Sequence, residues 1–129
     1  MKRTRLRPKG LGTQWKAKLD KLCREVVFAR DKETCQWCHS RVKQMHWAHV
    51  RSRRYLTSRW DLRNSLVLCA GCHLRWHHQP MLASKWFEQA FPARWQAVMF
   101  YDLGAKPGKI DKEIIRLDLE QKLNEYGGC

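Results

Sequence analysis

Two short stretches of sequence decide the expected fold of this chain: Cys35-Gln-Trp-Cys38 at residues 35–38 and Cys69-Ala-Gly-Cys72 at residues 69–72. The spacing within each stretch lets both thiolates reach one tetrahedral Zn²⁺ ion, and four thiolates complete its coordination. One such pair alone could be a redox motif, but two pairs favour a metal site. Because 30 residues lie between the pairs, the ion would clamp two elements together. We therefore expect a structural zinc bound by Cys35, Cys38, Cys69 and Cys72.

The size and composition of the chain agree with this expectation. It has 129 residues, of which 43% are hydrophobic, and is expected to form one compact domain with a modest core. Ion binding adds directly to the folding free energy of such a domain. There is no apolar stretch of about 18 residues and no apolar segment behind the basic N-terminus, so we expect neither a membrane span nor a secretory signal. In a reducing cytoplasm the six cysteines would be metal ligands rather than disulfides.

The charge of the chain predicts a polyanionic partner. The chain has 26 Lys and Arg against 12 Asp and Glu, a formal net charge of +14. Because it has no dominant basic amphipathic helix of the kind that binds membrane surfaces, nucleic acid is the favoured partner. Residues 1–10 hold five bases and no acid, typical of a flexible arm along a phosphate backbone or of a solubilising tail. Residues 41–63 hold seven bases and one acid and are strongly basic, whereas residues 102–125 hold five bases and six acids and are nearly neutral. We expect the binding face in the first half and middle of the chain.

Hydrophobic periodicity predicts several helices around a short extended segment. Apolar residues recur at helical spacing from Trp15 to Val26, with Cys23 on the apolar stripe, and this helix is expected to end near Arg30. Residues 35–50 show a short apolar–polar alternation, typical of a hairpin-like segment. Further helices are expected from residues 69–72 onward, over about 83–90 and 92–102, and after a break at 103–108. The core face of the last helix is expected to hold Ile110, Ile114, Leu117 and either Leu119 or Gln121.

The histidines form a second candidate site. His73 and His77 stand at positions i and i+4 of the helix expected after the second cysteine pair, so they can share a metal ion. His49 lies in the segment between the pairs, which the zinc would hold near that helix. An imidazole there can act as a general base, since its unperturbed pKa is about 6.5. Taken alone, His49 could instead be a core histidine bonded to a carbonyl group. Asn64 completes the order His49, Asn64, His73.

In this combination the residues resemble the zinc-stabilised branch of the HNH nuclease family. The resemblance rests on the two cysteine pairs, on His49 and Asn64, and on His73 directly after the last cysteine, and it covers about residues 26–80. The match includes Arg30-Asp31 before the first pair. Three further segments resemble the small HNH proteins of tailed bacteriophages: Ser52-Arg53, Arg59-Trp60-Asp61 and His77-His78-Gln79-Pro80.

The resemblance implies an α+β fold. Its centre would be a small ββα-metal, treble-clef-like core with a structural zinc, flanked by an N-terminal helix and C-terminal helices. The expected organisation is a basic flexible arm over residues 1–12, the HNH nuclease core with its leading helix over residues 13–80, and a C-terminal helical extension over residues 81–129.

The resemblance also implies roles for single residues. His49 would deprotonate the water that attacks a phosphodiester, and Asn64 would pin the loop that orients His49. His73 and His77 would hold one catalytic divalent ion, which could be Mg²⁺, Mn²⁺, Ni²⁺ or Zn²⁺. Arg53 would contact the phosphate or the transition state. DNA phosphates are also expected to contact the flanking residues Arg51, Arg54 and Arg59.

One position departs from the family pattern. The residue before the general base is usually a His or Asp that binds the catalytic ion, but here it is Ala48. His46 lies on the same face of an extended strand and could supply the missing ligand. Alternatively, water fills that position and the ion rests on His73 and His77. In the third alternative catalysis is lost and only DNA binding is kept.

The resemblance predicts a metal-dependent HNH endonuclease that hydrolyses DNA phosphodiester bonds, by nicking or double-strand cleavage, to 5′-phosphate and 3′-hydroxyl ends. The alternative is a non-catalytic zinc-finger DNA-binding protein with the same cysteine framework. DNA is the expected partner, and no membrane partner is expected. If the protein is phage-encoded, a packaging protein such as a terminase is a further expected partner, and the host cytoplasm is the expected location. A monomer or weak dimer is expected.

Overall fold

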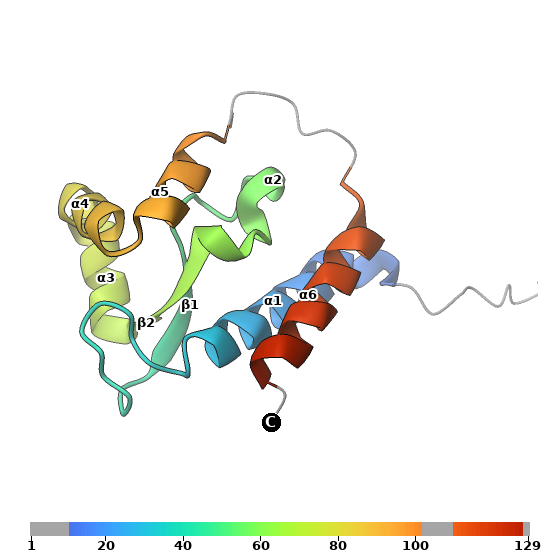
Figure 1. Cartoon of the computed structure of the whole chain (residues 1–129), viewed down its shortest axis with the longest axis horizontal. Coiled ribbons are helices and arrows are strands. Elements are labelled where there is room, and N and C mark those ends of the chain that lie inside the picture. The colour runs from blue at the N-terminus through green and yellow to red at the C-terminus, as the bar shows by residue number, and fades with distance from the viewer. Residues whose placement is uncertain (1–10, 102–109, 128–129) are drawn as a thin grey trace, which may run out of the picture.

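The computed structural model of the protein describes residues 11–101 and 110–127, in which helices cover both faces of a small sheet (Figure 1). The arm predicted over residues 1–12 falls almost entirely outside the described residues, and so does the break predicted at residues 103–108. The elements follow one another as η1 (Gly12–Gln14), α1 (Trp15–Arg30), β1 (Met45–His49), α2 (Leu56–Arg59), η2 (Leu62–Asn64), β2 (Ser65–Cys69), α3 (Ala70–His78), α4 (Pro80–Ala90), α5 (Pro92–Met99) and α6 (Lys112–Gly127).

The sheet consists of the two antiparallel strands β1 and β2. Met45 pairs with Cys69 and His49 pairs with Ser65, so β2 ends where β1 begins. All residues of β2 are buried. The segment predicted to be hairpin-like, residues 35–50, supplies only β1, and its partner strand follows after α2 and η2. A sheet of two strands is marginal in water, and its stability therefore depends on the helices packed on either face.

One face of the sheet is covered by α3, α4 and α5. Ala48 of β1 and Leu66 and Leu68 of β2 form an apolar cluster with residues of these helices, among them Phe87 and Val98. All five side chains are buried, at 1% exposure or less. Helix α3 follows β2 without a loop, so the chain folds back over this face directly after the strand.

Prolines mark the beginnings of α4 and α5. Pro80 and Pro92 each stand in the first turn, where the missing N–H costs no helical hydrogen bond. Helix α5 begins at residue 92, as the sequence predicted. Helix α4 begins earlier than the predicted start near residue 83, and α5 ends at Met99 rather than near residue 102. None of the helices in residues 11–101 and 110–127 has the length and apolarity that crossing a membrane requires.

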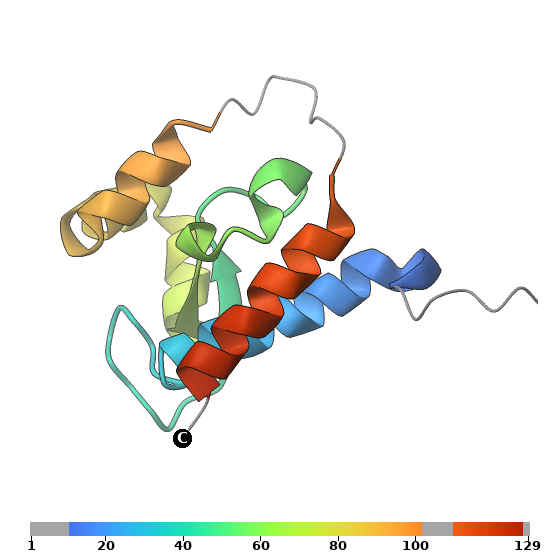
Figure 2. The same ribbon diagram turned by 45° about the vertical axis from the view of Figure 1, so that its right-hand side comes forward.

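The other face of the sheet is covered by α1 and α6, which lie side by side (Figures 1 and 2). Val67 of β2 packs here against Leu19, Cys23 and Val26 of α1 and against Leu119 of α6. The three α1 side chains are fully buried. This confirms the predicted first helix, its end at Arg30 and the prediction that Cys23 is a core residue.

The face of α6 that meets the core differs from the predicted one. Leu119 is 1% exposed, but Ile114 is 64% and Leu117 is 56% exposed, so the prediction was wrong for these two residues. The inward stripe runs through Ile115, Leu119 and Leu123, at positions i, i+4 and i+8. Because α6 carries apolar side chains on two stripes, periodicity alone does not decide which of them packs on α1.

Two leucines of α6 test this packing. We expect Leu119→Ala to lower the free energy of unfolding by about 2–4 kcal/mol, because it removes buried methyl groups and leaves a cavity. Leu117→Ala, the matched control on the same helix, should change it by less than about 0.5–1 kcal/mol. Urea unfolding of the zinc-loaded variants measures both. Equal losses in the two variants would contradict the packing of α6.

Candidate functional site

Four cysteine side chains meet at one end of the sheet. Two of them lie in the loop after α1, while Cys69 ends β2 and Cys72 lies in the first turn of α3. The four Sγ atoms all lie within 4.8 Å of one another, and those of Cys38 and Cys69 are 3.7 Å apart. In a tetrahedron with zinc–sulfur bonds of about 2.3 Å, sulfurs lie about 3.8 Å apart. The cluster can therefore hold a structural metal ion such as zinc, and it joins the four cysteines that the sequence predicted: Cys35, Cys38, Cys69 and Cys72.

Backbone N–H groups point at two of these sulfurs. The N–H of Cys38 donates to Sγ of Cys35 at 3.5 Å, and the N–H of Cys72 donates to Sγ of Cys69 at 3.4 Å. Burial raises the pKa of Cys35, but backbone hydrogen bonds, that from Cys38 foremost, outweigh burial and lower the pKa to about 7. Burial and the neighbouring thiols raise the pKa of Cys72. Because metals bind the thiolate, the backbone already favours the ligand form at Cys35.

Aromatic side chains hold the loop of the first cysteine pair against the helices. The ring of Trp37 stacks on Trp86 of α4 with 5.0 Å between centroids, and the guanidinium of Arg75 lies 4.5 Å from the Trp37 ring centre. The N–H of Gln36 donates to the carbonyl of Val67 at 2.9 Å. The loop is thus tied to α3, α4 and β2 at once.

Three histidines form a second cluster, between β1 and α3. Nδ1 of His46 lies 2.9 Å from Nδ1 of His73, and Nε2 of His77 lies 3.2 Å from Nε2 of His73. Burial, followed by the charges of His77 and His46, lowers the pKa of His73. In the described part of the chain, the four cysteines place their ligand atoms close enough together to share one ion. The three histidines do not form such a group of three.

His49, His73 and His77 line one pocket, with a volume of about 430 Å³, as the order of these residues in the sequence led us to expect. Arg53 lines the same pocket from the loop after β1. His46 does not line it, although it contacts His73. The structure therefore brings together, on one concave surface, residues that lie 28 positions apart, from His49 to His77.

His49 presents an unpartnered ring nitrogen. Its Nε2 atom is buried and makes no hydrogen bond within the protein. The ring packs edge-on against Trp47, with 4.2 Å between centroids. Burial, aided by the charge of Arg53, lowers the pKa of His49 to about 4, against the opposing effect of a hydrogen bond with the backbone of Arg59. His49 is consequently neutral near pH 7, and its Nε2 has no hydrogen-bond partner among the described residues.

Asn64 holds the loop that follows β1. Its side chain is fully buried. Oδ1 accepts the N–H of Arg51 at 2.7 Å, and Nδ2 donates to the carbonyls of Arg51 and Ser58, each at 3.1 Å. The carbonyl of Asn64 accepts the N–H of Val50 at 2.8 Å. These four bonds fix the chain on the C-terminal side of His49.

The four arginines predicted to contact DNA fall into two kinds. Arg53 and Arg54 are exposed, the side chain of Arg53 to 60%. Arg59 is 14% exposed and pairs with Asp20 of α1. Arg51 directs its guanidinium at α5, where Nε donates to the carbonyl of Val98 at 3.3 Å. Arg53 also lies 3.9 Å from Asp20, but its side chain stays mostly exposed, so Arg53 and Arg54 are the two of the four that are most accessible to a ligand.

Two acids outside the predicted site residues hold the chain around β1 and β2 in place. Asp20 accepts hydrogen bonds from Nε of Arg59 at 2.9 Å and from Nε1 of Trp60 at 2.8 Å. Asp31 accepts the N–H of Val67 at 3.0 Å and pairs with Arg30 at 2.8 Å. Arg30-Asp31 was part of the matched pattern, but nothing in the sequence distinguished Asp20 from other acids on helix surfaces. Asp20 thus ties α1 to α2 and the residue after it, and Asp31 ties the end of α1 to β2.

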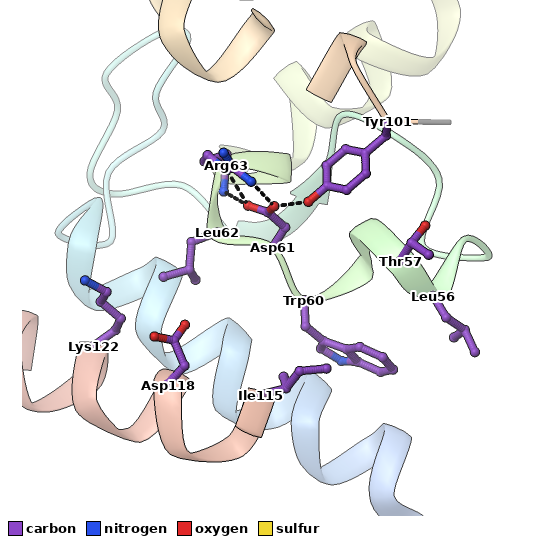
Figure 3. A pocket seen from close by; sticks show the side chains of 10 residues that line it. All are labelled: Leu56, Thr57, Trp60, Asp61, Leu62, Arg63, Tyr101, Ile115, Asp118 and Lys122. Atoms are coloured by element: carbon purple, nitrogen blue, oxygen red, sulfur yellow. Dashed lines mark hydrogen bonds and ion pairs between the residues drawn. The ribbon is translucent and has the colours of Figure 1, made fainter. Parts of the chain in front are cut away.

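A second pocket, with a volume of about 420 Å³, lies between η2 and α6 (Figure 3). There Asp61 accepts hydrogen bonds from Nη2 of Arg63 at 2.7 Å and from the hydroxyl of Tyr101. Burial raises the pKa of Asp61, but these partners outweigh burial and hold the pKa below its usual value. The carboxylate of Asp61 and the guanidinium of Arg63 therefore neutralise each other in this pocket.

Comparison with known protein families, with curated proteins and with solved structures found no match to this chain.

The cysteine cluster predicts one zinc ion per chain. Cys69→Ala removes a sulfur that joins β2 to α3, so we expect this variant to lose both zinc and the cooperative unfolding transition. The matched control is Cys23→Ala, a buried cysteine outside the cluster, which should keep its zinc. Metal analysis and thermal unfolding of the purified proteins measure these effects. Well under one zinc per wild-type chain would contradict the site.

The low pKa of His49 predicts a pH effect on stability. A folded pKa of about 4 lies below the value of about 6.5 in the unfolded chain, so between these values the unfolded chain binds the extra proton. The stabilisation by neutral His49 is complete above about pH 6.5 and is lost as the pH falls toward 4. Between pH 7 and 5, wild type should lose up to about 2 kcal/mol relative to His49→Asn. A difference between the two proteins that does not change with pH would contradict the burial of His49.

Proposed function

We propose that this protein is a metal-dependent HNH endonuclease that hydrolyses DNA phosphodiester bonds. The proposal includes a treble-clef-like ββα-metal core, in which β1, β2 and α3 surround the catalytic pocket and the cysteine cluster holds a structural zinc. The observation that carries it is the pocket in which the unpartnered Nε2 of His49 and the paired His73 and His77 lie together. The order of these residues along the chain matches the resemblance to the HNH family.

His49 acts as the general base in this proposal. It is neutral at pH 7, its Nε2 has no partner in the protein, and it lines the pocket, so it can accept a proton from a water bound there. Asn64 acts through the backbone, because its hydrogen bonds to Arg51 and Ser58 hold the loop after His49. Asn64 is therefore a positioning residue and does not react.

His73 and His77 are the proposed ligands of the catalytic ion. Two ring nitrogens bound at about 2.0–2.1 Å lie about 2.9–3.4 Å apart at bond angles from 90° to tetrahedral, and their Nε2 atoms are 3.2 Å apart. A divalent ion bound there would stabilise negative charge on the scissile phosphate and the departing 3′-oxygen. Ala48 supplies no ligand to this ion, because its side chain is apolar, 1% exposed and packed in the apolar cluster under α3.

DNA is the proposed substrate because of charge and exposure. The net charge of +14 favours a polyanion, and Arg53 lines the pocket with an exposed guanidinium that can contact a phosphate. Arg54, exposed next to it, is a proposed flanking contact. For Arg51 and Arg59 the structure favours another role, since both bind other parts of the protein and thereby position the loop that carries Arg53 and Arg54.

Plasmid cleavage by zinc-loaded protein with added Mg²⁺, Mn²⁺ or Ni²⁺ tests the proposal. We expect wild type to convert supercoiled plasmid to nicked or linear forms, and His49→Ala to be slower by about 10²–10⁴-fold, as for the loss of a general base. His78→Ala is the matched control, because His78 is exposed and lies outside the pocket. It should cleave like wild type. A DNA-binding assay separates loss of cleavage from loss of binding.

If wild type and His49→Ala bind DNA but leave it equally intact with every metal, the protein is instead the non-catalytic zinc-finger DNA-binding protein of the alternative hypothesis. The phage origin, the terminase partner, the host cytoplasm as location and the monomeric or weakly dimeric state stay predictions from the resemblance.

A further inference from the structure

The ring of His73 is held at both of its nitrogens. Nδ1 faces Nδ1 of His46 at 2.9 Å, and Nε2 faces Nε2 of His77 at 3.2 Å. A neutral imidazole carries one N–H, so one of its nitrogens donates and the other accepts. His73 can therefore accept a proton from His46 and donate to His77, or donate to His46 and keep Nε2 unprotonated.

The contacts of His73 distinguish its two nitrogens, since Nε2 faces the other pocket histidine, His77, and Nδ1 faces His46. His73 and His77 line it with His49 and Arg53, whereas His46 does not. The separation between the Nε2 atoms of His73 and His77 is that of two ligands on one ion. His46 contacts the opposite side of the His73 ring, and the three histidines do not form a group of ligand atoms close enough for one ion.

An ion on the Nε2 atoms leaves only one arrangement of protons. Nε2 of His73 must then be unprotonated, so the one remaining ring proton is on Nδ1. The partner of that N–H is Nδ1 of His46, which must accept and therefore carries its own proton on Nε2. Histidines that bind metals usually donate their other N–H to such a partner, which fixes the tautomer and the orientation of the ring.

We propose that His46 is not a ligand of the catalytic ion but the positioning residue of His73. It accepts the Nδ1–H of His73 and so directs the unprotonated Nε2 toward the pocket and His77. This deepens the proposed function on which it rests, and it assigns the position left by Ala48 to water rather than to His46.

The cysteine cluster sets the distance between these two histidines. His46 pairs with Leu68 in the sheet, and Cys69 follows Leu68 directly. His73 follows Cys72 in the first part of α3. The angle between β2 and α3, which the cluster holds through Cys69 and Cys72, therefore decides whether Nδ1 of His46 reaches the His73 ring.

Two substitutions of nearly equal shape separate positioning from ligation. In His46→Asn, Oδ1 occupies the place of Nδ1 and can still accept the hydrogen bond, whereas in His46→Leu it cannot. Ni²⁺ is titrated into zinc-loaded protein without DNA, by calorimetry. Wild type should bind one further Ni²⁺, His46→Asn should bind it within about threefold of wild type, and His46→Leu should bind it about 10–100-fold more weakly. His73→Ala should bind none there, and His78→Leu is the surface control.

If His46→Asn binds Ni²⁺ as weakly as His46→Leu, His46 is a direct ligand and the proposal is overturned. It is also overturned if His46→Leu binds as tightly as wild type, or if wild type binds no further ion. The zinc content of every variant confirms that its fold is intact.

The tautomer of His73 gives a readout that requires no variant. Long-range ¹H–¹⁵N spectra of wild type with a second equivalent of Zn²⁺ should show His73 protonated at Nδ1 and bound to zinc at Nε2, with His46 free of metal. Protonation at Nε2 of His73, or zinc on His46, would overturn the proposal. Because no DNA is present, the plasmid assay can fail while this result stands, in which case only the nuclease proposal is lost.

Discussion

The closeness of four cysteine sulfurs is the constraint on which the rest of the structure depends. Thiolates within 4.8 Å of one another repel unless a cation neutralises them. A metal ion such as zinc, bound there, would do so and would add its binding free energy to folding. The cluster joins the loop after α1 to the end of β2 and the start of α3. A two-stranded sheet has little stability by itself, so the position of α3 on that sheet, and of every group on α3, follows from this junction.

Buried polar side chains hold the irregular segment between β1 and β2 in place, as the cysteine cluster holds α3. Asn64 bonds to Arg51 in the loop after β1 and to Ser58 of α2, and Asp20 of α1 holds Arg59 and Trp60. Asp31 reaches the backbone of β2. An unpaired buried polar group is costly, so each of these acids and amides restrains the chain near the pocket. Some buried polar atoms of the described residues have no partner, among them Nε1 of Trp47, Oγ of Ser65 and Nε2 of His49, the last at the centre of the proposed chemistry.

Sequence reasoning succeeded where the relevant geometry is local. Two residues between paired cysteines, and four positions from His73 to His77, place side chains together whatever the rest of the chain does. It failed on α6, where Ile114 and Leu117 were expected inside and are exposed. Both apolar stripes of that helix satisfy the same periodicity, and only the shape of α1 selects between them. The arginines were likewise predicted as one set, because nothing in their spacing shows that Arg59 has a partner 39 residues away.

By itself the sequence determined the cysteine site, the buried stripe of the first helix and the order of the histidines, because short-range spacing and residue chemistry are sufficient for these. The tertiary structure decided the pairing of β1 with β2, the partner of Asp20, and the contact of His46 with one nitrogen of His73 rather than the other. Those depend on strand register and on helix orientation, which arise from packing between segments distant in the chain. The four-cysteine cluster was thus predictable from residue types and spacing, but which ring nitrogens of the histidines face one another follows only from their arrangement in space.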